Sequence, residues 1–169
     1  MTDEPEYPFD SDLPEEPGDE LARMAQETIQ EQVGSTDVAN IRVRCQRVID
    51  LYAKGSIQDS RDNFHAALVL LYGEKTAHYD LSRTFSRRAA LMGEARAWTL
   101  FAMSWDRWLI SLGQPQRFGT QIIKREGRWS LGAVDTTISD LERAMYAVPP
   151  LFVQQQRAEQ LQRQEDANE

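Results

Sequence analysis

Residues 98–121 read WTLFAMSWDRWLISLGQPQRFGTQ and determine the fold that we predict for the chain. Apolar side chains recur in this stretch at steps of three and four residues: Trp98, Ala102, Trp105, Leu109 and Leu112. That spacing places them on one face of an α-helix. A second row, which includes Met103 and Ile110, runs beside the first. A helix that is apolar over most of its circumference is normally enclosed by others, so we expect this helix at the centre of an all-α fold.

The flanking sequence contains further helical patterns on both sides of this stretch. Helical periodicity predicts helices over residues 20–33, 37–54, 59–72, 76–92 and 137–147. Gly73, Gly93 and Gly113 recur every twenty residues, each where a left-handed residue would end a helix. Short connections make successive helices antiparallel. The expected architecture is all-α, with about six helices stacked as antiparallel hairpins.

The periodicity changes after Gly113. Two short strand-like runs flank Arg125-Glu126-Gly127, which predicts a minor two-stranded β-hairpin within residues 118–131. Residues 20–151 are predicted to form a single helical domain. Residues 152–169 are polar and have few apolar anchors, so we expect a C-terminal helix that is partly frayed.

The acidity of the chain is concentrated at its N-terminus. The formal net charge is −8, but nine of the 27 acidic residues lie in residues 1–20, where there is no base. Acids and four prolines predict a disordered tail over residues 1–19. Tyr7 and Phe9 within it suggest a docking segment that orders on a partner, and the alternative is a tail that only keeps the protein in solution.

Composition excludes several classes of function. The rest of the chain has 18 acids against 19 bases, which argues against nucleic-acid binding. There is no apolar run of about 18 residues and no signal-peptide pattern, so we expect a cytoplasmic protein that does not bind membranes. The single cysteine, Cys45, falls on an apolar helix row and is expected to be buried. No phosphate-binding loop and no metal-ligand spacing is present, so we predict no cofactor and no metal.

Two groups of residues resemble known patterns. Asp106-Arg107, followed by Gly113-x-x-Gln116-x-x-Gly119-Thr120-Gln121, resembles the DR…G-x-x-Q-x-(Y/F)-GTQ signature of an uncharacterised family of small bacterial helical proteins, over roughly residues 59–151. The segments HAALVLLYG and SRRAALMGEARAWTLFA resemble tetratricopeptide-like helical hairpins over about 50 residues. These resemblances imply a helical fold and direct attention to the signature residues, but they imply no reaction.

The signature residues have two interpretations. In the first, Asp106 is buried on the second apolar row and anchors backbone N–H groups of the loop between Gly113 and Gln121. In the second, a polar pocket is lined by the following residues: Asp106, Arg107, Gln116, Gly119, Thr120, Gln121 and His65. Its arginine would bind a carboxylate or phosphate, and His65 would act as a general base oriented by Asp106.

A third group of residues suggests binding to another protein. Arg83 and Arg87 are one helical turn apart and face the same way. Trp108 lies off the main apolar row and Trp129 lies in the predicted hairpin, so both are candidates for contacts with a partner. A solvated helix face is the alternative for the arginines. We therefore predict a non-catalytic protein-interaction module, a small helical adaptor or regulator with an acidic arm, and keep as the alternative an enzyme or ligand-binding protein that uses the polar pocket. The pattern leaves the partner and the oligomeric state open.

Overall fold

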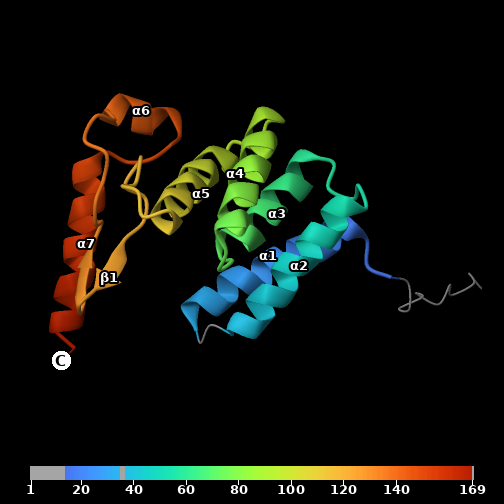
Figure 1. Ribbon diagram of the computed structural model, residues 1–169, viewed down its shortest axis with the longest axis horizontal. Helices are drawn as coiled ribbons and strands as arrows, with labels where there is room; N and C mark the ends of the chain where they lie inside the picture. The colour runs from blue at the N-terminus through green and yellow to red at the C-terminus, as the bar shows by residue number, and fades with distance from the viewer. Residues whose placement is uncertain (1–13, 35–36, 169) are drawn as a thin grey trace, which may run out of the picture.

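The computed structural model describes residues 14–34 and 37–168 and confirms an all-α fold with a minor β-hairpin (Figure 1). The elements in chain order are α1 (Pro17–Val33), α2 (Val38–Ala53), α3 (Ser60–Leu71), α4 (Thr76–Leu91), α5 (Ala97–Ser111), β1 (Ile123–Arg125), β2 (Arg128–Ser130), α6 (Asp140–Met145) and α7 (Leu151–Asp166). All six predicted helices are present, and the polar C-terminal segment forms a continuous seventh helix.

The helices form a stack with the hairpin and α7 at one end of the long axis of the molecule. Figure 1 shows α1 and α2 side by side below α3 and α4, α5 next to α4, and the hairpin with α6 and α7 beyond α5. Helix α3 packs against α1, α2, α4 and α5. Its buried residues are Asn63, Phe64, Ala66, Ala67, Val69, Leu70 and Leu71. The most enclosed helix is therefore α3, and not α5 as the sequence predicts.

Helix α5 instead joins two apolar clusters. Its residues Ala97 and Leu100 belong to the main core, which α1, α2, α3 and α4 complete. Its residue Ala102 packs with Phe118 and Val148 in a second, smaller cluster. The tryptophan-rich helix thus connects the helical stack to the segments that follow it in the chain.

Helix α1 begins at Pro17, three residues before the predicted domain boundary. Proline is well tolerated in a first helical turn, because its missing N–H would have no helical partner there. Residues 14–16 precede the helix, and residues 1–13 of the predicted tail, with Tyr7 and Phe9, lie outside the described residues.

Two of the three regularly spaced glycines behave as predicted. Gly93 has φ of 102° and Gly113 has φ of 70°, so both end a helix in the left-handed region. Gly73 has a different role. A Cβ at this position would lie 2.3 Å from His78 Nδ1, so the absence of a side chain lets the start of α4 pack closely.

The hairpin is shorter than residues 118–131. Ile123 pairs with Ser130 and Arg125 with Arg128, across a turn in which Glu126 has φ of 50° and Gly127 has φ of 77°. Two successive positive φ angles are typical of a type I′ turn.

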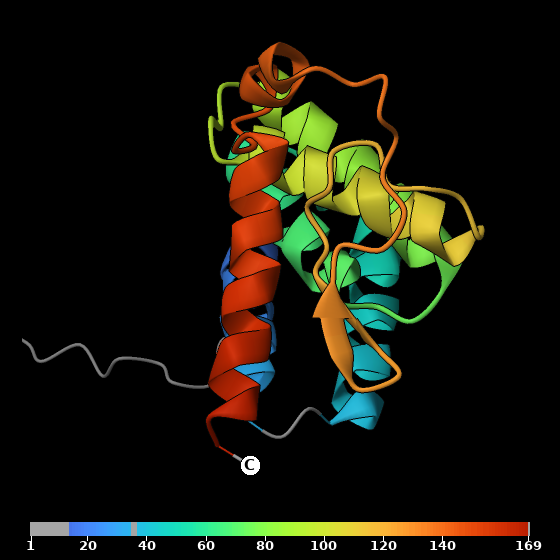
Figure 2. The ribbon, with the colours of Figure 1, turned by 90° about the vertical axis from the view of Figure 1, so that its left-hand side faces the viewer.

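Helix α7 lies along this hairpin (Figure 2). The backbone N of Trp129 donates a hydrogen bond of 2.8 Å to Gln162, and the Trp129 indole N–H donates one of 2.5 Å to Glu165. These bonds explain why α7 continues to Asp166. Of the helices in residues 14–34 and 37–168, none has the length and apolar character that a bilayer crossing requires.

Candidate functional site

The loop after α5 is built around one buried carboxylate. Asp106 is 0% exposed and accepts four hydrogen bonds, from the backbone N of Arg117 (2.7 Å), of Phe118 (2.9 Å) and of Thr120 (2.8 Å), and from the Thr120 hydroxyl (2.7 Å). Burial raises the pKa of Asp106, and the hydrogen bonds from the loop act in the opposite direction. Both carboxylate oxygens are thus used to hold the loop.

Gln116 holds the same loop from inside. Its side-chain oxygen accepts from Gln121 N at 2.8 Å, and its amide donates to Gln121 O at 2.9 Å and to Leu131 O at 2.5 Å. Gly119 has φ of 74°, and a Cβ there would lie 3.0 Å from the side chain of Leu151. Gln116, Gly119 and Thr120 therefore shape the loop, which agrees with the first of the two interpretations.

A residue that the sequence did not single out completes this arrangement. Arg143 of α6 is 2% exposed and donates to Phe118 O at 3.0 Å and to Ile138 O at 2.9 Å. It thereby attaches α6 to the loop. No local signal identifies it, because Arg143 lies in a short polar helix where a solvated arginine is the default expectation.

His65 does not join the Asp106 network. It is half-buried on α3, and its Nδ1 is buried without a hydrogen bond among the described residues. Burial lowers the pKa of His65, and Arg61 and Arg96 lower it further. All the hydrogen bonds of Asp106 go to residues 117–120. Asp106 therefore does not orient His65 as a general base would require.

Arg107 has surroundings of its own, apart from the carboxylate beside it in the sequence. Its Nε donates to Gln121 Oε1 at 2.8 Å and its Nη1 to Leu71 O at 2.5 Å. The guanidinium lies over the Tyr72 ring, with 4.7 Å from Cζ to the ring centroid. Arg107 and Gln121 together line a cavity with a volume of about 300 Å³.

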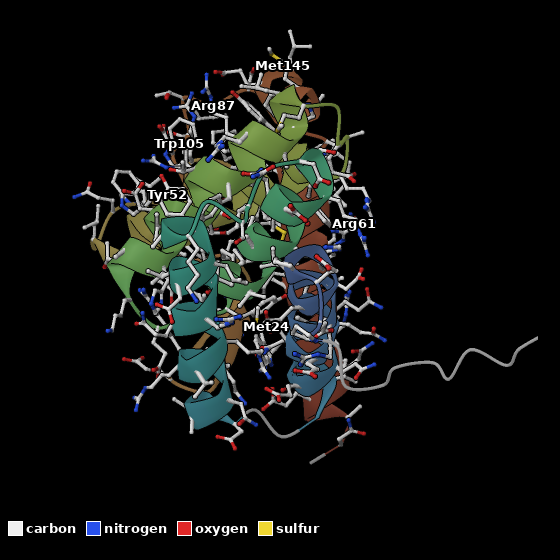
Figure 3. The ribbon with its side chains drawn as sticks, turned by 90° about the vertical axis from the view of Figure 1, so that its right-hand side faces the viewer. Met24, Tyr52, Arg61, Arg87, Trp105 and Met145 are labelled. Carbon is white, nitrogen blue, oxygen red and sulfur yellow. The ribbon has the colours of Figure 1, made fainter. Side chains whose placement is uncertain are left out.

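Arginines and tryptophans of α4, α5 and the loop after α5 form a second group, which we call the cation–aromatic face: Arg83, Arg87, Trp105, Trp108 and Arg117. The Arg83 guanidinium lies 4.1 Å from the Trp108 ring centroid and 5.4 Å from that of Trp105. The Arg117 guanidinium also lies near the Trp105 ring, with 5.1 Å from Cζ to the ring centroid. Arg87 is exposed one turn along α4 (Figure 3). The sequence identified Arg83, Arg87 and Trp108. Trp105, which the sequence places on the apolar row of its helix, packs against the second cluster and also contacts the arginines.

Trp129, which the sequence also predicts to contact a partner, contacts α7 of the same chain, because its indole N–H donates to Glu165.

Cys45 is buried, and burial raises the pKa of its thiol to about 11, so the thiol stays protonated at neutral pH. Within residues 14–34 and 37–168, His, Cys, Asp and Glu side chains form no group of three or more that could hold a metal ion.

Comparison of the chain with protein-family models, with curated proteins and with solved structures gave no match. The resemblances to the bacterial signature family and to tetratricopeptide-like hairpins therefore stay predictions.

Proposed function

We propose that this chain is a non-catalytic protein-interaction module of the cytoplasm, which binds an acidic segment of a protein partner through the cation–aromatic face. The observation that carries the proposal is the position of Arg83, stacked on Trp108 at 4.1 Å and on Trp105 at 5.4 Å. Stacking holds the guanidinium at the surface, where its remaining N–H groups can donate to a carboxylate.

The composition of this face is that of a protein–protein interface. Tryptophan and arginine are the residues most often found at energetically important interface positions. Both tryptophans are half-buried, so each has a rigid base in the fold and an accessible edge.

The charges of this face favour an acidic partner. Asp80 pairs with Arg83 at 2.7 Å, and Glu142 lies 3.6 Å from Arg117. In the part of the chain that the structure describes, Arg87 makes no ion pair. Positive charge is therefore in excess on this face, and an approaching acidic segment would be attracted to it.

The alternative of a catalytic pocket has less support. Asp106 is fully engaged by the loop and does not orient His65, as described above. The predicted acidic arm, residues 1–19 with Tyr7 and Phe9, stays a prediction, either as a second docking segment or as a tail that only keeps the protein in solution.

The test is affinity capture from the native host, with the full chain as bait and quantitative identification of the captured proteins. The decisive variant is Arg87→Glu, because Arg87 is exposed and its side chain makes no hydrogen bond or ion pair within residues 14–34 and 37–168. Arg128→Glu in the hairpin is the matched control, since it changes the charge equally at another exposed site.

We expect the wild-type chain and Arg128→Glu to capture the same acidic protein, and Arg87→Glu to lose it. The captured complex should also weaken as salt concentration rises, because its ion pairs lie at the surface. Equal capture by Arg87→Glu and Arg128→Glu would overturn the proposal.

A further inference from the structure

Arg107 is a half-buried cation without an anionic partner in the described part of the chain. The structure gives it no ion pair among residues 14–34 and 37–168, and its hydrogen bonds go to two neutral oxygens, Gln121 Oε1 and Leu71 O. Burial lowers the pKa of Arg107, and the groups that act against this are the phenols of Tyr72 and Tyr79, not a carboxylate. A cation that is withdrawn from water is normally paired with an anion, and the half-buried guanidinium of Arg107 has only neutral partners.

The guanidinium is held rigidly in one orientation. Nε is fixed by Gln121, Nη1 by the last residue of α3, and the plane of the group stacks on Tyr72 at 4.7 Å. Gln121 is itself held, because its backbone N donates to Gln116 at 2.8 Å. A positioned arginine of this kind loses little conformational entropy when it binds an anion.

One nitrogen of the guanidinium remains available. Nη2 donates no hydrogen bond within the described residues, and it is not among their solvent-inaccessible unpaired side-chain atoms. It is therefore accessible to solvent, and Arg107 lines a cavity of about 300 Å³ together with Tyr79, Ile110, Ser111, Gln121, Ile122 and Ile123. Three isoleucines give the cavity apolar walls, and Tyr79 supplies a phenol with no hydrogen bond in the described part of the chain.

We propose that this cavity binds a small carboxylate anion that has a short apolar body. The carboxylate would accept hydrogen bonds from Nη2 of Arg107, and the apolar body would lie against Ile110, Ile122 and Ile123. The volume is at the lower end of the range for ligand sites, which suits a molecule of a few carbon atoms. This site is independent of the cation–aromatic face and does not rest on the proposed function.

The test is a titration of the full, ¹⁵N-labelled chain followed by NMR, with sodium butyrate as the probe and butyramide as its neutral counterpart. Sodium chloride keeps the ionic strength equal in all samples. We expect butyrate to shift the amide signals of the cavity residues saturably, with a Kd on the order of 1 mM, as is usual for so small a ligand. Butyramide should bind at least about tenfold more weakly, because it lacks the charge.

Two variants at one exposed position separate binding from folding. Ser111 lies at the end of α5 and lines the cavity. Ser111→Glu brings a carboxylate to the cavity and should abolish butyrate binding, whereas Ser111→Gln has nearly the same size and should retain it. Arg107→Lys should weaken binding about tenfold, since an ammonium on a flexible stem does not reproduce the fixed guanidinium.

Several results would overturn the proposal. They are a failure of butyrate to saturate, equal binding of butyrate and butyramide, and equal binding by the two Ser111 variants. Saturable binding of inorganic phosphate without binding of butyrate would also overturn it, because it would show a site for an anion alone. Should Arg107→Lys fail to fold, the Ser111 pair decides the question.

Discussion

Thr120 donates two hydrogen bonds to a single oxygen of Asp106, one from its backbone N at 2.8 Å and one from its hydroxyl at 2.7 Å. The other oxygen of Asp106 accepts from the N–H groups of Arg117 and Phe118. A single carboxylate at the middle of α5 thus sets the path of the chain for several residues after that helix. The tight Gly119 turn and the cavity beside Arg107 both depend on this path.

Replacement of Asp106 by Asn should destabilise the fold by about 3 kcal/mol, because hydrogen bonds to a buried charge are lost. The amide keeps one acceptor oxygen but turns an NH₂ group toward backbone N–H donors. Urea unfolding of the purified chain measures the change. Asp50→Asn is the control, since Asp50 is exposed, and it should change the free energy of unfolding by no more than about 0.5 kcal/mol. Similar stability of both variants would show that the loop does not need the carboxylate.

Replacement of Gly73 by Ala should cost about 2 kcal/mol, because the new methyl group would lie 2.3 Å from His78 Nδ1 and 2.7 Å from His78 Cβ. His78 is buried, and its Cβ is fixed by the backbone, so the side chain has little room to move away from the new methyl group. Gly34→Ala provides the comparison, since a Cβ at Gly34 meets nothing within 4 Å. Thermal unfolding followed by circular dichroism should show a clearly lower Tm for Gly73→Ala alone.

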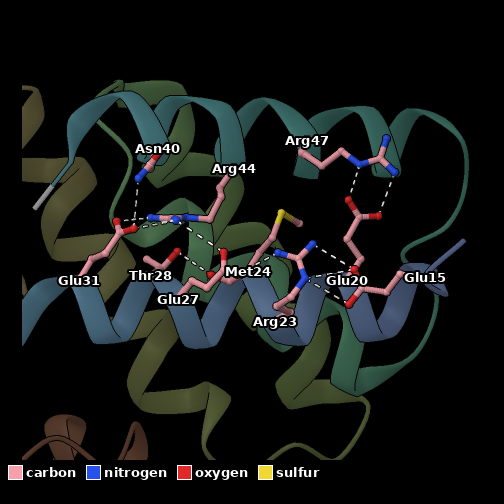
Figure 4. A network of polar contacts seen from close by, with 10 residues as sticks. All are labelled: Glu15, Glu20, Arg23, Met24, Glu27, Thr28, Glu31, Asn40, Arg44 and Arg47. Carbon is pink, nitrogen blue, oxygen red and sulfur yellow. Dashed lines mark hydrogen bonds and ion pairs between the residues drawn. The ribbon is translucent and has the colours of Figure 1, made fainter. Parts of the chain in front are cut away.

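Ion pairs join α1 to α2 (Figure 4), and the most buried arginine among them should matter far more than an exposed arginine of α2 that pairs outside α1. The Arg44 side chain is 8% exposed and pairs with Glu27 and Glu31, whereas the side chain of Arg42, two residues earlier, is 68% exposed and pairs with Glu74. We expect Arg44→Gln to destabilise the chain by about 2 kcal/mol and Arg42→Gln by less than about 0.5 kcal/mol, since exposed ion pairs contribute little. Denaturant unfolding of both variants measures the difference, and equal losses would contradict the prediction.

Stability should fall as the pH drops below about 6.5, the ordinary pKa of histidine. His78 is buried at the start of α4, where its Nδ1 accepts from Lys75 N at 3.4 Å. Burial, followed by the charge of Lys75, lowers the pKa of His78 in the folded chain. Between its ordinary and its lowered pKa, the unfolded chain therefore binds a proton that the folded chain does not, and the free energy of unfolding decreases.

The measurement is urea unfolding at pH values of about 7.5, 6.5 and 5.5, for the wild type and for His78→Gln. The variant should lose less stability across this range, because Gln can accept the same hydrogen bond but does not titrate. His65→Gln should have a similar effect, since burial also lowers the pKa of His65. A wild-type chain that is equally stable at all three pH values would contradict the prediction.

Local sequence patterns predicted the secondary structure because such patterns depend on neighbouring residues. Periodicity located all six helices, and Arg125-Glu126-Gly127 located the hairpin turn. The ends of the helices were less predictable. Helix α7 extends to Asp166 through contacts of Glu165 and Gln162 with Trp129, which lies more than 30 residues away in the chain.

The candidate site was predictable in part. The burial of Asp106 followed from the apolar row in which it lies, and one of the two interpretations of Asp106 was that it anchors the loop. The choice between the two required the tertiary structure, because a buried carboxylate needs hydrogen-bond donors and the sequence does not say which ones it finds. The same holds for Arg143, whose partners Phe118 O and Ile138 O are backbone atoms that no sequence pattern identifies.

By itself, then, the sequence determined the helical class, the hairpin turn and the polar residues that deserve study, since helix and turn preferences are local properties of the chain. Only the tertiary structure decided that Asp106 binds the loop and not His65, that Arg83 stacks on Trp108, and that Arg107 faces a cavity without an acid. The physical reason is that packing brings these groups together from separate helices. The energy of a buried polar or charged group depends on the neighbours that packing supplies.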